Sequence, residues 1–270
     1  MDKFVLYCKS YIKDLPRAKA LAESINQHNT DNIPFYVSCP SSDYNNFKET
    51  LPSFVNLITD EDIVGKTYNQ NWHTQQVVKS QFWKLEISDN YLMIDSDSYF
   101  IKPFSLADFM YDEETPYTVL HEQKELFTWS VNKVDMLGFN PKDSFVADRL
   151  RIMADIFKRK GRVYDFGPSP CIWSAKVWRD LEELYCKPNN LSFEQLIEYC
   201  HSEFTWYGEA LLEFKSIPIY PVEPLFKVFH YPQQLNEYYN QKITEEMIAE
   251  NYMGVVMTSN FGAPVKYSTL

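Results

Sequence analysis

The stretch with the clearest chemical potential places Asp95 and Asp97 directly after an apolar run, residues 91–94. Removing carboxylates from water is costly, so carboxylates at the end of a core strand need a compensating partner. Two carboxylates one residue apart can converge on one Mg²⁺ or Mn²⁺, ions that prefer oxygen ligands and also bind substrate phosphates. The alternative is a polar turn, D-S-D-S, in which Asp and Ser side chains cap backbone amides. The pair by itself leaves both interpretations open.

Alternating strands and helices are expected around this motif in the first half of the chain. Apolar runs predict strands, and apolar residues at helical spacing predict helices. The expected strands are 4–8, 34–38, 54–58 and 91–94, and the expected helices are 14–29 and 71–88. Such alternation is typical of an α/β fold with a largely parallel sheet. Ligands bind beyond the carboxyl ends of such strands, so Asp95 and Asp97 should lie on that rim.

The second half of the chain predicts a more mixed set of elements. We expect strands at 117–120 and 217–221, a loop or short strand at 168–174, and helices at 145–160, 175–185, 193–201 and 204–214. Prolines are scattered along this half rather than gathered in one linker, and there is no internal repeat. We therefore predict a single domain, residues 1–270, whose halves 1–110 and 111–270 share one sheet.

Composition places the chain among ordinary globular proteins and limits its partners. Hydrophobic residues make up 45% and charged residues 23% of the sequence, which supports a sizeable core. The net charge of −11 repels a phosphate backbone, so general nucleic-acid binding is not expected. Only 7 glycines are present and no glycine-rich phosphate loop is found. An anionic substrate would therefore need a lysine, an arginine or a metal ion.

Cysteine usage and hydropathy bear on the compartment. The five cysteines form no C-x-x-C pair and are odd in number, a pattern that favours reduced thiols. The first residues have neither the charge pattern nor the apolar core of a signal peptide. No apolar stretch approaches the length of a membrane span. These features predict a cytoplasmic protein with at most peripheral contact at the inner face of the membrane.

The order of these segments resembles glycosyltransferases of the GT-A fold. The resemblance lies in "MIDSDSYFIKPF", in the preceding "WHTQQVVKSQFWKLEISDNYL", in the opening "LYCKSYIKDLPRAKALAESI" and in "SEFTWYGEALL". More narrowly, the chain resembles an uncharacterised bacterial GT-A family of polysaccharide biosynthesis. The resemblance implies a Rossmann-like mixed, mostly parallel sheet flanked by helices. It also implies transfer of a sugar from a nucleoside-diphosphate sugar to a glycan or glycolipid acceptor in surface polysaccharide synthesis.

A metal site follows from the same resemblance. Asp97 would bind Mn²⁺ or Mg²⁺ directly, and Asp95 would bind the ribose or the metal. Many such enzymes take a third ligand from a late histidine, and His230 in "FKVFHYPQQ" is the candidate. The alternative for His230 is a histidine packed between Phe229 and Tyr231, and both interpretations stay open. The family's metal-binding histidine is often followed by glycine and lysine, so the match here is partial.

The donor nucleotide would lie at the end of the first strand, according to the resemblance. Tyr7 to Tyr11 would hold the base and ribose. Lys9 or Lys13 could reach the diphosphate, and Lys79 on the helix beside the cleft is a similar candidate. For each lysine the simpler alternative is a solvated surface side chain.

An inverting transfer also needs a general base for the acceptor hydroxyl. Glu203, near the start of the predicted helix 204–214, is the first candidate, and Asp165 in "VYDFGPSP" is the second. The alternative for Glu203 is a glutamate that stabilises the first turn of its helix. If neither is the base, the reaction would be retaining, with the donor diphosphate assisting.

Two other functions use similar sequence features. A sugar-nucleotide-binding module that keeps the fold without catalysis is the first. The second is a phosphohydrolase of the haloacid dehalogenase type, which also carries a strand followed by D-x-D. That chemistry places the motif on the first strand and needs a later acidic pair, and neither is found here.

Overall fold

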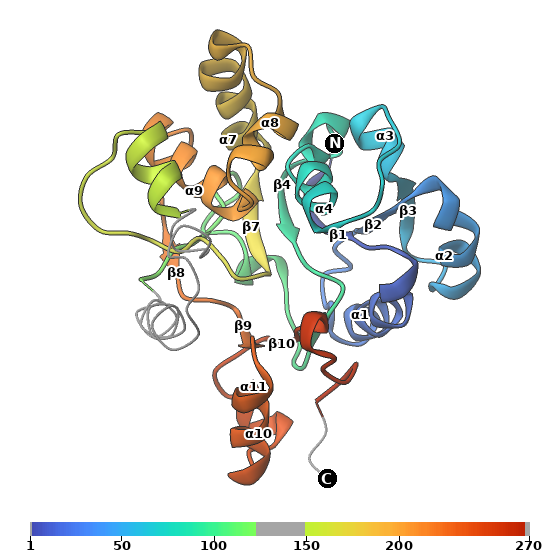
Figure 1. Ribbon diagram of the computed structural model, residues 1–270. Helices are drawn as coiled ribbons and strands as arrows, with labels where there is room; N and C mark the ends of the chain where they lie inside the picture. The colour runs from blue at the N-terminus through green and yellow to red at the C-terminus, as the bar shows by residue number, and fades with distance from the viewer. Residues whose placement is uncertain (1, 123–148, 268–270) are drawn as a thin grey trace.

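The computed structural model describes residues 2–122 and 149–267, which form a mixed α/β fold built on a five-stranded sheet. The strand order is β3-β2-β1-β4-β7, and the first four strands run parallel while β7 is antiparallel to β4. The strands are β1 Asp2–Lys9, β2 Phe35–Cys39, β3 Asn56–Thr59, β4 Ser88–Met93 and β7 Cys171–Ser174. The fold class predicted from the sequence is thus confirmed (Figure 1).

Both faces of this sheet are covered by helices, as its continuous apolar strands require. Along β1, Val5 and Tyr7 point to one core cluster while Leu6 and Cys8 point to the other, which is the period of two of a β-strand. The first face carries α4 Trp72–Lys79, α7 Ala175–Leu181, α8 Phe193–Tyr199 and α9 Glu203–Phe214, and the second carries α1 Leu15–His28 and α2 Tyr44–Thr50.

The second half of the chain joins the first through strands rather than through a linker. Strand β7 adds directly to β4, and a smaller sheet pairs β5, immediately after the D-x-D motif, with the late strand β10. The remaining elements are α3 Asp60–Val64, β5 Ser98–Phe100, β6 Thr118–Val119, β8 Pro221–Val222, β9 Phe226–Phe229, α10 Pro232–Asn240, α11 Glu245–Ala249 and β10 Gly254–Met257. In Figure 1, α10 and α11 lie at the bottom, below β9 and β10.

Most predicted elements are present, but two expectations need correction. The helix expected at 71–88 ends at Lys79, because the Ser80 hydroxyl and the Gln81 side chain both bond the carbonyl of Val77, and a 3-10 turn and β4 follow. The strand expected at 217–221 is only the two-residue β8.

The helix expected at 145–160 falls partly outside the described residues. Its described part contains a short π-helix, Arg151–Ile156. The sequence did not predict the elements α2, α3, β5, α10, α11 and β10. Within the described part of the chain, no helix combines the length and the apolar character needed to cross a membrane.

Candidate active site at the carboxyl edge of the sheet

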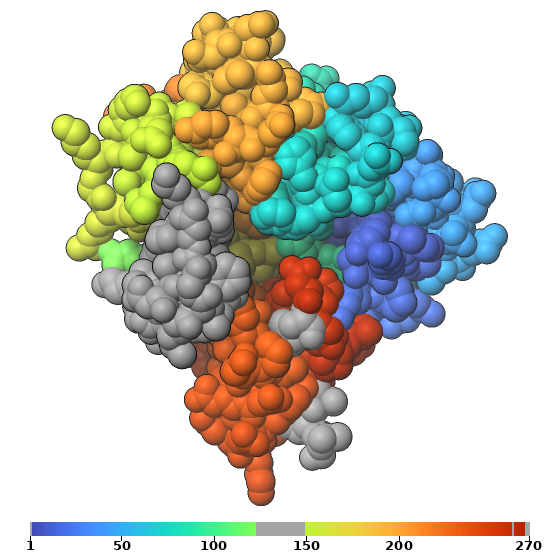
Figure 2. All heavy atoms as spheres, in the orientation of Figure 1, coloured from blue at the N-terminus to red at the C-terminus, as the bar shows by residue number. Residues whose placement is uncertain are grey.

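A cavity of about 440 Å³ lies at the carboxyl ends of β1 and β4. Asp95, Asp97, Lys79, Glu203 and His230 all line it, although they are spread over more than half of the sequence. Figure 2 looks into a hollow at the centre of this face, between atoms of the first half in cyan and atoms near the C-terminus in red. The cavity thus has the location expected for the ligand site of a parallel sheet.

The D-x-D motif is held on this rim by two segments from the second half. The backbone N–H of Asp95 donates to the Ser169 hydroxyl at 2.8 Å. The Asp97 carboxylate accepts the Ser259 N–H at 2.8 Å, and its carbonyl accepts the N–H of Met257 at 2.8 Å. Asp97 therefore caps a backbone amide, as the polar-turn interpretation expects, while both aspartates also line the cavity.

The protonation of Asp97 reflects its confined position. Burial and, after it, the neighbouring charge of Asp95 raise the pKa of the Asp97 carboxyl to about 6, although the Ser259 N–H acts in the opposite direction. Two adjacent carboxylates that repel each other are the condition that a bound cation relieves. The electrostatics of the motif thus fit a divalent cation.

Lys79 lies between two carboxylates that come from different halves of the chain. Its Nζ is 2.5 Å from Asp95 Oδ1 and 3.2 Å from Glu203 Oε1. The Glu203 N–H donates to the Gln76 side chain at 3.3 Å, which fixes the start of α9 against α4. Lys79 and Glu203 are both almost completely buried. Lys79 thus lines the cavity and bridges Asp95 and Glu203, and its expected contact with the diphosphate stays a prediction.

The charges of this bridge influence each other strongly. Burial disfavours the ammonium, but Asp95 and Glu203 outweigh it and raise the pKa of Lys79 above its ordinary value. Burial raises the pKa of the Glu203 carboxyl, and the Lys79 ammonium partly offsets this rise. Glu203 is thus a buried carboxylate with increased proton affinity, a property required of a general base.

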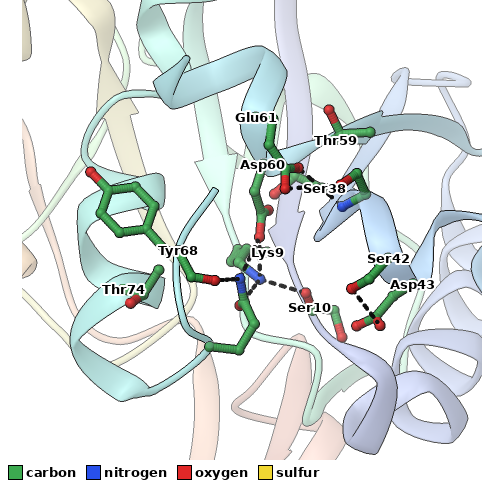
Figure 3. A network of polar contacts seen from close by, with 12 residues as sticks. Lys9, Ser10, Ser38, Ser42, Asp43, Thr59, Asp60, Glu61, Tyr68 and Thr74 are labelled. Atoms are coloured by element: carbon green, nitrogen blue, oxygen red, sulfur yellow. Dashed lines mark hydrogen bonds and ion pairs between the residues drawn. The ribbon is translucent and has the colours of Figure 1, made fainter. Parts of the chain in front are cut away.

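The end of β1 contributes Lys9, Tyr11 and Lys13 to the cavity wall. The Lys9 ammonium contacts Asp60 at 2.9 Å, the carbonyl of Ser10 at 2.6 Å and the Gln70 side chain at 3.2 Å (Figure 3). These contacts use all three of its donors. Lys9 therefore stabilises the wall, and the exposed Lys13 is the lysine at this end that can meet a phosphate group.

Tyr7 does not reach the cavity. Its ring stacks on Phe82 with centroids 3.8 Å apart, its hydroxyl shares a hydrogen bond with the Ser38 hydroxyl at 3.0 Å, and its side chain is fully buried. The strand continues to Lys9, so the rim begins only at Ser10. Tyr7 was expected to begin the segment that holds the base and ribose of the nucleotide. This expectation is wrong for Tyr7, and only the residues near the end of β1 can line that site.

His230 and Asp165 differ in their relation to the cavity. His230 lines it, and burial lowers the pKa of its imidazole to about 4, so the ring is neutral near pH 7, the form that binds metals. Among the described residues, no three His, Cys, Asp or Glu side chains form a ready-made metal cluster. Asp165 is buried behind the wall and is paired with Arg149 at 2.7 Å.

Several cavity residues were not identified from the sequence. Ser169 and Ser259 fix the D-x-D motif, and Arg149 lines the wall beside them. Trp72 is 59% exposed at the cavity, and its ring meets that of His201 edge-on at 5.6 Å. One sequence signal could have identified this part of the rim. Asn71 is a good helix N-cap residue, and Trp72 follows it at the first position of α4.

Replacing Asp97 with asparagine should stabilise the metal-free protein near pH 7. The raised pKa means that the stability contributed by neutral Asp97 is complete below about pH 4 and is lost as the pH rises through about 6. Asparagine avoids this loss and keeps an acceptor for Ser259. We expect a gain of about 1–3 kcal/mol near pH 7 that disappears below about pH 4.

Urea unfolding in the presence of a chelator measures this difference. The exposed Asp89 on β4 offers a matched control, because Asp89→Asn should change the free energy of unfolding by less than about 0.5 kcal/mol. An Asp97→Asn variant that is less stable than the wild type near pH 7 would contradict the prediction.

The fold and the cavity define an α/β protein with a cluster of buried, coupled charges where parallel sheets bind their ligands. The chain belongs to a family of unknown function, DUF6492, whose family model matches residues 5–208. Asp95, Asp97, Lys79 and Glu203 lie within the matched segment, and His230 lies after it. A comparison with curated proteins gives no match.

Proposed function

We propose that this protein is a metal-dependent glycosyltransferase that moves a sugar from a nucleoside-diphosphate sugar to a glycan or glycolipid acceptor. The observation that supports this proposal best is the meeting of the D-x-D aspartates with buried Glu203 in one cavity at the carboxyl edge of the sheet. A metal-binding pair and a general base are the two protein components that inverting transfer needs.

Asp95 and Asp97 are the residues that would hold the cation. Mg²⁺ is commonly bound by one or two carboxylates together with substrate phosphates, so a third protein ligand is not required. The cation supplies neutralisation of the leaving diphosphate when it is bound. His230, neutral and in the same cavity, is available as a further ligand.

The remaining side chains have separate tasks in the proposed reaction. Tyr11 and Lys13, shortly after β1, line the cavity and would contact the nucleotide and its phosphates. The acceptor hydroxyl attacks the anomeric carbon, the bond from that carbon to the diphosphate breaks, and Glu203 takes the hydroxyl proton. Lys79 keeps Glu203 aimed into the cavity and favours its ionised state before the transfer.

The proposed compartment is the cytoplasm, in line with a nucleotide-sugar substrate. All five cysteines are described and buried, and none of them forms a disulfide bond. Such thiols fit a reducing environment.

Thermal unfolding with a panel of nucleotide sugars tests the proposal. We expect a UDP-, GDP- or dTDP-sugar to raise the Tm in the presence of Mn²⁺, and a chelator to remove the shift. Asp97→Asn should abolish the Mn²⁺-dependent part of the shift. If no nucleotide sugar shifts the Tm, the proposal fails. If a nucleotide sugar binds but its nucleotide is never released, not even by slow hydrolysis, the protein is a binding module instead.

A further inference from the structure

A second and larger cavity adjoins the candidate active site. Its volume is about 1140 Å³, and Pro168, Val228 and His230 line both cavities. The two cavities are therefore adjacent, with these residues between them. The end of a ligand that lies at His230 in the second cavity is next to the space that Glu203 lines.

The second cavity combines aromatic and polar groups. Tyr164, Tyr231 and Tyr252 line it, and each is only partly buried, so their rings can meet a ligand. Asn251 and Glu223, both exposed, add an amide and a carboxylate. Tyrosine rings offer an apolar face together with a polar edge, which suits a sugar ring with its C–H face and its hydroxyl rim.

Size and charge narrow the ligand further. Small-molecule sites usually measure about 300–1,000 Å³, so a cavity of this size has room for more than one sugar unit. Glu122 on its wall is ion-paired with Arg162, and the exposed carboxylate of Glu223 lies on the same wall as the ammonium of Lys227, whose Nζ lies 4.6 Å from the centre of the Tyr238 ring. Among the described lining residues the charges thus balance, and the wall has no surplus of positive charge with which to bind an anionic glycan.

We infer that this cavity binds the acceptor, and that the acceptor is a neutral oligosaccharide of several units with its reactive end at His230. The inference rests on the proposed function and adds the substrate class to it. Most of this wall comes from residues 221–252, after the segment that the family model matches, and the rest, including Tyr164 and Pro168, comes from within that segment.

Saturation-transfer NMR with neutral tetrasaccharides tests the inference on the full chain. The probes are maltotetraose, cellotetraose, mannotetraose and N-acetylated chitotetraose, with tetragalacturonate as the anionic comparison, each with Mn²⁺ and UDP present. We expect at least one neutral probe to bind and tetragalacturonate not to bind. Asn251→Trp, which fills the mouth of the cavity, should weaken that binding by about tenfold or more.

Two further variants keep the result interpretable. Asn240→Trp, at an exposed position on α10 outside both cavities, should bind the probe like the wild type. Tyr164→Ala, which removes a ring contributed by a different segment, should weaken binding as Asn251→Trp does. Both cavity variants should keep the wild-type Tm shift with nucleotide sugar and Mn²⁺.

The failure of the inference and that of the proposed function give different results. Should no neutral probe bind the wild type, or should both cavity variants bind as well as it does, the acceptor assignment is overturned while the donor shift stands. Binding of tetragalacturonate with equal affinity would overturn the neutral class. Loss of the nucleotide-sugar shift in the wild type itself would overturn the proposed function.

Discussion

Replacing Glu203 with glutamine should lower the rate of sugar transfer by about 10²–10⁴-fold, the range that a positioned general base contributes. Glutamine has nearly the same shape, so the contact with Lys79 and the start of α9 should persist. Since burial already disfavours the Glu203 charge, the variant should be at least as stable as the wild type. Initial rates of nucleotide release, measured with the donor found by thermal unfolding, report the effect.

The pH dependence of the same rate gives a second test of Glu203. A base must be deprotonated, so transfer should fall as the pH drops through the pKa of Glu203. The ordinary pKa of a glutamate is about 4.3. Burial raises the pKa of Glu203, so the rate should begin to fall at a pH above that value. This fall should be absent from the residual rate of the glutamine variant.

Two comparisons make the result for Glu203 specific. Glu213→Gln changes an exposed glutamate on the same helix and should leave the rate within about twofold. Asp165→Asn tests the other candidate, whose carboxylate is already paired with Arg149. A glutamine variant of Glu203 that retains most of its activity would remove Glu203 as the base and favour a retaining reaction.

The position of the D-x-D pair was predictable from the sequence because it depends on local order. A buried strand ends at Met93, and whatever follows must lie on the rim of a parallel sheet. The same rule explains the error at Tyr7. The first strand runs to Lys9, so Tyr7 belongs to the strand interior, where alternation turns it toward the core beneath α4.

Contacts between distant segments could not be predicted in this way. Lys79 and Glu203 are 124 residues apart, and only the packing of α9 against α4 brings them together. From the sequence, Lys79 was expected on a helix beside the cleft, either as a solvated side chain or in contact with a phosphate. Ser259, which holds Asp97 from the C-terminal segment, is still more distant, 162 residues along the chain.

Lys79 shows how these distant contacts bear on the stability of the protein. Its ammonium is the charge that compensates both Asp95 and Glu203 at the junction of the two halves. Removing one partner of a buried ion pair leaves an uncompensated charge and typically costs about 3–5 kcal/mol. Lys79→Met should therefore lower the free energy of unfolding near pH 7 by about that amount.

The loss caused by Lys79→Met should depend on pH in a defined direction. Lys79 has a raised pKa, so its stabilising contribution is complete throughout the neutral range and is lost only at strongly alkaline pH. Without the ammonium, the raised pKa of Glu203 rises further, and the carboxyl takes up a proton more readily in the folded state than in the unfolded state. The variant should thus recover part of its stability as the pH falls from about 8 to about 5.

Urea unfolding at several pH values, with Lys176→Met as the matched control, distinguishes a buried bridge from an ordinary surface pair. Lys176 contacts Asp180 at 2.8 Å on the exposed side of α7, and exposed pairs contribute at most about 1 kcal/mol. Equal losses for the two methionine variants would show that Lys79 is not the compensating charge. Because Asp95 and Glu203 come from different halves, the same bridge that stabilises the junction would also set the distance between the proposed metal-binding pair and the proposed base.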